Sequence, residues 1–140
     1  MKRQENLLKN QKGFTLIEII AVLVILGILS AVAVPKYMDL QNQSRIKAAD
    51  AAIAEVKSRL SNGFGIYLLK SGGALPNTVA LVCGANGIND ANVLPLNAVG
   101  TVPNLGDYTA TIAANGLITV TAVQGTALSP ARTNTWTLPN

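Results

Sequence analysis

Hydrophobic residues form an almost unbroken run near the start of the chain. From Phe14 to Val34 the sequence reads FTLIEIIAVLVILGILSAVAV, and Glu18 is its one charged residue. As an α-helix this run spans about 31 Å, at about 1.5 Å per residue, which matches the hydrocarbon core of a bilayer. We therefore expect residues 14–35 to form a membrane-spanning helix. A buried core helix is the alternative, but the remaining residues are too few to surround it.

A different pattern follows this run. Apolar residues recur at spacings of three and four, which is typical of one face of a helix, and this stripe contains Ile46, Ala49, Ile53, Val56 and Leu60. Asn62-Gly63 is a helix stop signal, although Phe64 and Tyr67 extend the stripe by another turn. We expect an amphipathic continuation over residues 36–62, which gives one helix of about 48 residues and about 70 Å.

Residues 63–140 carry a β pattern. Polar and apolar residues alternate over 108–112 and 117–123, and Asn115-Gly116 between them predicts a β-hairpin. Weaker strand patterns lie at 79–83, 93–96 and 133–138. A lone hairpin is marginally stable, so the sheet needs an apolar partner. We predict an α+β chain in which the long N-terminal helix packs its stripe against a small antiparallel sheet.

Charge is concentrated at the N-terminus. The chain has 140 residues and a net charge of +4. Residues 1–13 contribute +3 (four basic side chains and Glu5), and the rest contributes +1 (seven basic and six acidic). A basic segment before an apolar span predicts a cytoplasmic N-terminus, with residues 36–140 on the other side of the membrane. No aromatic residues are interleaved with the basic ones, so no specific nucleic-acid partner is expected.

The composition excludes much of enzyme chemistry. The chain has no His and one Cys, which removes His acid–base pairs, Cys–His nucleophiles, His metal sites and an internal disulfide. Beyond Gly63 the charged residues are Lys70, Asp90, Asp107 and Arg132. A membrane-anchored enzyme would need an acid–base pair or a metal cluster that this composition does not supply, so we expect no enzyme, no cofactor and no metal. Cys83 is expected to be a small buried hydrophobe, with an intermolecular disulfide as the alternative.

The junction before the apolar run carries a family resemblance. Residues 12–18, KGFTLIE, followed by a long apolar segment, resemble the processing motif of type IV pilins and type II secretion pseudopilins. Gly27, Pro35 and Tyr37 match further features of that family, which the chain resembles strongly over residues 12–37 and loosely over 38–62. The resemblance implies a pilin fold. It also implies that residues 1–13 are a leader, that a prepilin peptidase cuts after Gly13, and that the new amine of Phe14 is methylated.

The resemblance also assigns roles inside the span. It implies that Glu18 of one subunit meets the Phe14 amine of a neighbour during assembly. A carboxylate in a membrane helix is costly and usually paired, and opposite charges attract strongly in an apolar environment; the alternative is that Glu18 reaches the headgroups. Gly27 and Pro35 both weaken a helix and bracket a segment that bends or locally unwinds. The alternative there is an ordinary kink of the kind that membrane helices tolerate.

The function implied by the resemblance is structural. We expect a major-type pilin that polymerises with copies of itself into an extracellular type IV pilus for adhesion, motility or uptake. It would wait in the inner membrane and engage the peptidase/methyltransferase and an inner-membrane assembly platform. A type II secretion pseudopilin is the alternative, although major pseudopilins often carry an acidic calcium loop and no acidic residue follows Asp107. A soluble binding domain released by cutting near Ala33 would leave residues 13–18 unexplained.

Overall fold

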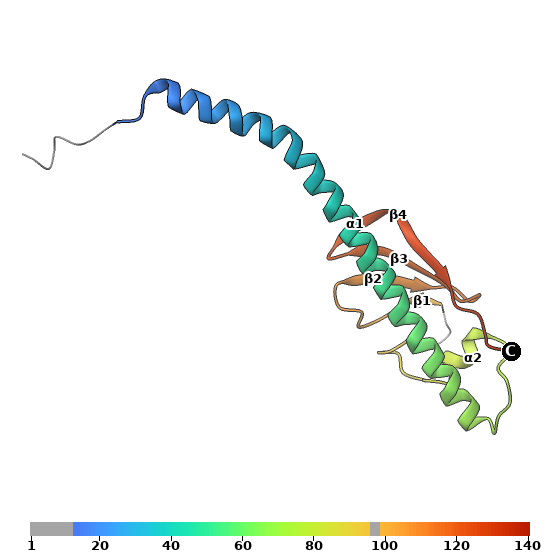
Figure 1. The fold of residues 1–140 in the computed structure, drawn as a ribbon. Coiled ribbons are helices and arrows are strands. Elements are labelled where there is room, and N and C mark those ends of the chain that lie inside the picture. The colour runs from blue at the N-terminus through green and yellow to red at the C-terminus, as the bar shows by residue number, and fades with distance from the viewer. Residues whose placement is uncertain (1–12, 96–98) are drawn as a thin grey trace, which may run out of the picture. The chain divides into compact units, whose positions relative to one another are not determined.

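The long helix and the hairpin predicted from the sequence are both present. The computed structural model describes residues 13–95 and 99–140. The elements in order are α1 (Leu16–Lys70), α2 (Val79–Cys83), β1 (Gly100–Thr101), β2 (Tyr108–Ile112), β3 (Leu117–Val123) and β4 (Thr126–Thr135) (Figure 1). The expected α+β fold class is confirmed. The predicted leader lies outside the described residues, apart from Gly13.

The chain divides into two compact units, Met1–Gln41 and Asn42–Asn140, and α1 contributes residues to both. In the first unit the apolar side chains of α1 are exposed on every side of the helix. Its most apolar 18-residue window has a mean hydropathy of 2.9, and none of that window is buried. This part of α1 is therefore long enough and apolar enough to cross a bilayer.

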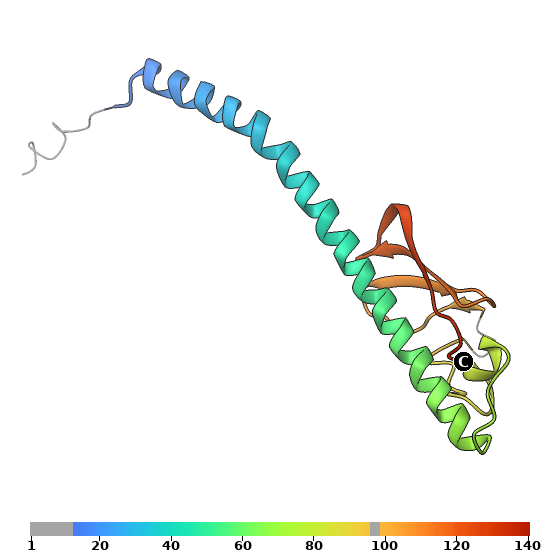
Figure 2. The same ribbon diagram turned by 45° about the vertical axis from the view of Figure 1, so that its right-hand side comes forward.

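The second unit is a four-stranded antiparallel sheet with the order β1-β2-β3-β4, and α1 covers one of its faces (Figure 2). Side chains from one stripe of α1 and from the inner positions of β2 and β3 form a single core. Burying each large aliphatic side chain contributes about 1.5–3 kcal/mol, so this core holds the helix and the sheet together. The fully buried large side chains include Val56, Leu60, Ile118 and Val120.

The β2–β3 hairpin has the predicted bounds because its turn is specified locally. Gly116 has a φ of 80°, and its N–H donates to the carbonyl of Ala113 at 2.9 Å. The side chain of Asn115 accepts a hydrogen bond from the N–H of Leu117 at 3.1 Å. A Cβ at position 116 would also collide with the carbonyl of Trp136, whose N–H donates to the carbonyl of Gly116 at 3.0 Å. Glycine is therefore required here by both conformation and space.

The predicted helix end at residue 62 is wrong, because α1 continues to Lys70. Gly63 is buried inside the helix, where a Cβ would lie 2.8 Å from the carbonyl oxygen of Val82. It permits close packing rather than ending the helix. The true end is a Schellman turn, in which Gly72 has a φ of 68° and the N–H of Gly73 donates to the carbonyl of Leu68 at 2.9 Å.

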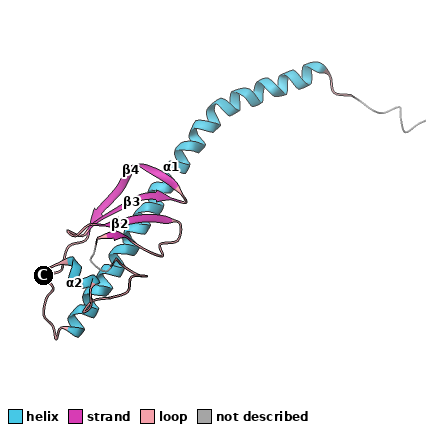
Figure 3. Cartoon of the chain, turned by 180° about the vertical axis from the view of Figure 1, so that it is seen from behind, coloured by secondary structure: helices cyan, strands magenta, loops and turns pink. Residues whose placement is uncertain are grey.

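Three weaker strand predictions also need correction. Residues 79–83 form the helix α2, which lies beside the end of α1 (Figure 3), because Val79, Val82 and Cys83 are buried at helical spacing. Residues 93–95 form a turn and residue 96 lies outside the described residues. Of residues 133–138, the last three lie beyond β4, which begins much earlier, at Thr126. The two-residue strand β1 was not anticipated.

Candidate functional site

The N-terminus of α1 is capped by the side chains of Thr15 and Glu18. The N–H of Thr15 donates to Oε2 of Glu18 at 2.8 Å, and the hydroxyl of Thr15 donates to the same oxygen at 2.8 Å. The N–H of Glu18 lies 3.4 Å from the Thr15 hydroxyl oxygen. This reciprocal arrangement is a capping box, which satisfies N–H groups that have no partner inside the helix. Within the described residues, Oε1 of Glu18 accepts no hydrogen bond.

The residues just before the helix are open. Gly13, Phe14 and Thr15 precede the first residue of α1 and have no regular secondary structure. No atom lies within 4 Å of a Cβ built on Gly13, and the Phe14 side chain is 84% exposed. The Gly13–Phe14 peptide bond is therefore accessible in the subunit itself.

The two residues expected to weaken the span lie within an unbroken helix. Helical geometry continues through Gly27 and Pro35. A Cβ on Gly27 would have nothing within 4 Å. Both positions have open surroundings in the isolated subunit, and the proposed bend or local unwinding stays a prediction.

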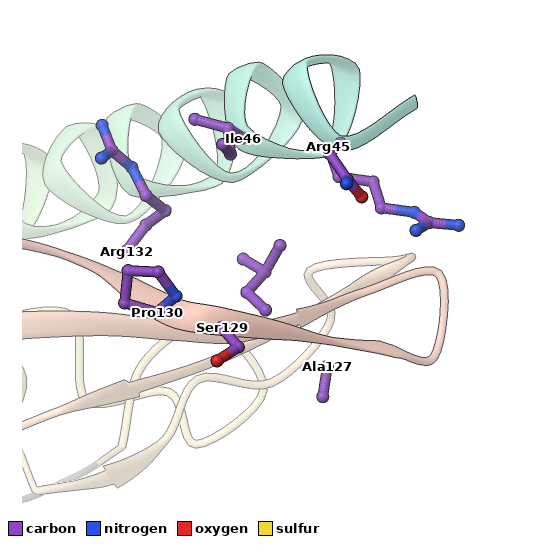
Figure 4. A pocket seen from close by; sticks show the side chains of 8 residues that line it. Arg45, Ile46, Ala127, Ser129, Pro130 and Arg132 are labelled. Atoms are coloured by element: carbon purple, nitrogen blue, oxygen red, sulfur yellow. The ribbon is translucent and has the colours of Figure 1, made fainter. Parts of the chain in front are cut away.

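Four of the five residues expected to pack on the sheet lie in the core, namely Ala49, Ile53, Val56 and Leu60. Ile46 requires a correction, because it is 38% exposed and outside the core. It lines a groove between α1 and β4 instead (Figure 4). The apolar stripe of the sequence therefore extends one turn farther than the part that is covered.

Arg59 is a structural residue whose partners the sequence did not reveal. Its Nε donates to Glu55 at 2.9 Å, the expected pair one helical turn away. Its Nη1 donates to the carbonyls of Val93 and Pro103, both at 2.9 Å, and its Nη2 donates to the carbonyl of Asn104 at 3.0 Å. One guanidinium thus ties two loops to the helix. No side-chain pattern predicts this, because the acceptors are backbone carbonyls of irregular segments.

Further polar contacts, also missed from the sequence, fix α1 to the C-terminal part of the chain. Each joins a helix side chain to one on β4 or just after it: Asp50 to Arg132 (3.0 and 3.1 Å), Lys57 to Asn134 (3.0 Å) and Ser61 to Trp136 (3.1 Å). Most of these groups are partly exposed, so each contact contributes little alone. Together they fix the position of the last strand along the helix.

The described contacts of the second unit hold its helix, loops and strands together. Across residues 13–95 and 99–140, no three His, Cys, Asp or Glu side chains come close enough to hold a metal ion. Cys83 is fully buried at the end of α2. The features that set this chain apart are therefore the exposed apolar helix and the Gly13–Glu18 segment at its start.

Comparison with known proteins finds relatives through this segment. Residues 8–34 match the family described as "Prokaryotic N-terminal methylation motif". The chain is 53% identical over 47 residues to the type IV narrow pilus major component PilA5 of Thermus thermophilus, which is 34% of this chain and 40% of that protein. It is 44% identical over 52 residues to the type II secretion system core protein G of Pseudomonas aeruginosa, 37% of each chain.

One relative is matched over most of its length. The fimbrial protein EcpC of Eikenella corrodens is 33% identical over 119 residues, which cover 85% of this chain and 72% of that protein. The matches to PilA5 and core protein G, in contrast, span well under half of those proteins. No solved structure matches the chain.

Proposed function

Because this chain belongs to the type IV pilin family, a family of structural proteins, we propose that it is a major-type pilin that polymerises into an extracellular filament. The observation that carries the proposal is the start of α1. There the methylation motif leads into an apolar helix whose side chains are not buried by any other described part of the chain. An exposed apolar surface of this extent needs either lipid or other copies of the chain around it. A filament subunit is surrounded by lipid before assembly and by other copies of the chain afterwards.

Maturation is the first step. A prepilin peptidase cuts the Gly13–Phe14 bond and methylates the Phe14 amine, and the open surroundings of Gly13 support access to that bond. The leader carries a net charge of +3, which favours a cytoplasmic N-terminus. The second unit then lies outside the cytoplasm, and the apolar part of α1 anchors the subunit in the inner membrane.

Assembly is the second step, and it brings two isolated charges together. Phe14 of one subunit presents an ammonium group, and Glu18 of its neighbour presents a carboxylate. The capping box occupies Oε2 and leaves Oε1 to accept the neighbour's ammonium. Since an unpaired buried charge is strongly unfavourable, a subunit one turn out of place is rejected. The pair therefore selects the register of each added subunit, as buried polar residues do in coiled coils.

The segment between Gly27 and Pro35 has a separate role. Pro35 lacks the N–H that an α-helix uses, and Gly27 lowers helix stability by about 1 kcal/mol relative to Ala. This segment bends or locally unwinds when the apolar helices bundle. Because every copy changes in the same way, the axial offset between neighbours is kept.

A pseudopilin of a type II secretion system is the second candidate, and the 44% identity to core protein G favours it. The absence of acidic residues after Asp107 argues against the major kind with an acidic calcium loop. Deleting the gene separates the two functions. We expect loss of surface filaments, seen by electron microscopy, with protein secretion unchanged, and intact filaments with lost secretion would establish the pseudopilin instead.

A further inference from the structure

A groove of about 320 Å³ lies between strand β4 and the part of α1 that contains Asn42, Arg45 and Ile46. Ile46 lies on its helix side and Pro130 on its strand side (Figure 4), and Leu128 of β4 also lines it. At one end of the groove, the side chain of Arg132 extends from β4 to α1 and binds Asp50. At the other end, the side chain of Arg45 points away from the groove (Figure 4). Ile46, Leu128 and Pro130 therefore give the groove apolar walls, and an arginine lies at each end, of which Arg132 is already paired.

Arg45 makes no ion pair or hydrogen bond with any of the described residues. The same holds for Asp39, although Asp50 and Glu55 both bind arginines. Asp39 and Arg45 are six positions apart on α1, which separates them by about 9 Å along the axis and places them on different faces. They are therefore not placed to pair with one another within one chain, and the side chains of both are open to a charged partner from a neighbouring copy.

Asp39 lies in a segment suited to an apolar groove. Its neighbours Tyr37, Met38 and Leu40 are 62%, 53% and 62% exposed. Large apolar side chains beside a carboxylate complement a groove that has apolar walls and an unpaired arginine at one end. A second copy of this chain supplies that segment in a polymer.

The register set by the first helix turn brings the two surfaces to the same level. If the Phe14 ammonium of one copy meets Glu18 of the next, parallel helices are offset by four residues, or about 6 Å. Asp39 of the first copy is then level with Gln43 of the second, two residues before Arg45. Helical side chains lean toward the N-terminus, so the guanidinium of Arg45 approaches that level. One offset therefore satisfies both charge pairs.

We infer that the groove between α1 and β4 receives residues 36–40 of a neighbouring copy, with the Asp39 carboxylate of that copy bound to Arg45. This contact would fix the register of neighbouring subunits at a second place, about 25 residues along the helix from the Phe14–Glu18 pair. The inference rests on the proposed function, because the offset comes from that pair.

Asp107 offers Arg45 an alternative partner within the same chain. The two residues line a small hollow of about 100 Å³ but form no ion pair there. Asp107→Asn removes this alternative without touching residues 36–40. Lys47→Asp makes the same charge change as Arg45→Asp on the same helix, outside the groove. These two variants are the matched controls.

The test is a charge exchange in the full-length chain, with filaments counted by electron microscopy and mature subunit measured by mass spectrometry. Asp39→Arg and Arg45→Asp should each lower filament number roughly tenfold, because each sets like charges against one another. The double variant should recover to within about twofold of the unaltered chain. Lys47→Asp and Asp107→Asn should also stay within about twofold.

A double variant no better than the worse single variant overturns the inference, as do single variants that assemble normally. A loss with Lys47→Asp or Asp107→Asn as large as that with Arg45→Asp overturns it too. We expect Glu18→Ala to be processed but not assembled, because it removes the Phe14–Glu18 pair of the proposed function. If the contact fails its test while Glu18→Ala behaves in this way, the proposed function stands and only this contact is rejected. If Glu18→Ala assembles normally, the fault lies in the proposed function.

Discussion

The carboxylate of Glu18 accepts two hydrogen bonds from Thr15, one from the N–H and one from the hydroxyl, and both are 2.8 Å long. Both bonds end on Oε2, and among the described residues Oε1 accepts no hydrogen bond. On the assembly step proposed above, we expect Thr15 to act as a positioning residue that orients the carboxylate for the neighbouring subunit.

Replacing Thr15 tests that role. Thr15→Val keeps the shape of the side chain and the backbone N–H but removes the hydroxyl. We expect normal cleavage and about fivefold fewer filaments, in line with the loss of one helix cap. Thr15→Ser keeps a hydroxyl and should restore the number. Filament counts and subunit mass are the measurements, and equal filament numbers for Val and Ser would show that the hydroxyl has no positioning role.

The cleavage site gives a prediction with an internal control. Gly13→Val should leave the leader attached, because a Cβ at the scissile residue clashes in a peptidase site shaped for glycine. The subunit itself leaves open space around Gly13, so the block must arise in the peptidase. Gly27→Ala also adds a Cβ in open space and should be cut normally. The mass of the intact protein shows whether the leader is still attached in each variant. A Gly13→Val chain that begins at Phe14 would refute this account of processing.

Two glycines within α1, Gly63 and Gly65, should respond to alanine in opposite directions. Gly63→Ala places a Cβ 2.8 Å from the Val82 carbonyl oxygen, and we expect it to lower the free energy of unfolding by about 1–3 kcal/mol. Gly65→Ala meets no atom within 4 Å and should raise it by about 0.5–1 kcal/mol. Denaturation of residues 39–140, which contain the whole core, measures both. Stabilisation by Gly63→Ala would show that α1 and α2 do not pack this closely.

Arg59 should be the most important polar residue of the second unit. Arg59→Met keeps much of the aliphatic chain but removes donors to three loop carbonyls, so we expect a loss of about 2–4 kcal/mol in the free energy of unfolding. Lys57→Met removes one bond, to Asn134, and should cost less than about 1 kcal/mol. The same denaturation experiment compares the two. Equal effects would mean that the loops are held by packing alone.

The success of the sequence predictions depends on how local each signal is. The β2–β3 hairpin follows from Asn115-Gly116, because that turn is specified by two adjacent residues. The Gly13–Glu18 motif is equally local, and the family match confirms it. Gly63 is needed because the backbone of Val82 packs against it, and Val82 comes near only after folding. The sequence alone therefore gives the wrong interpretation, a helix end. The partners of Arg59 were missed for the same reason.

Short apolar runs were the other source of error. Residues 79–83 are compatible with either a strand or a helix, and packing against the end of α1 decides for a helix. Ile46 continues the helix periodicity but is left partly exposed, because the sequence does not show where the sheet ends. The residues that lie beyond the covered stripe are also those that line the proposed intersubunit groove.

The central claim is that Glu18 binds the Phe14 amine of the next subunit and thereby admits it to the filament. The most direct measurement counts surface filaments and mature subunit in cells that carry Glu18→Ala, with Ser30→Ala as a control for loss of a polar group in the same span. The account predicts that Glu18→Ala is cut after Gly13 and accumulates in the membrane with few or no filaments, while Ser30→Ala assembles normally. Abundant, normal filaments from Glu18→Ala would contradict it.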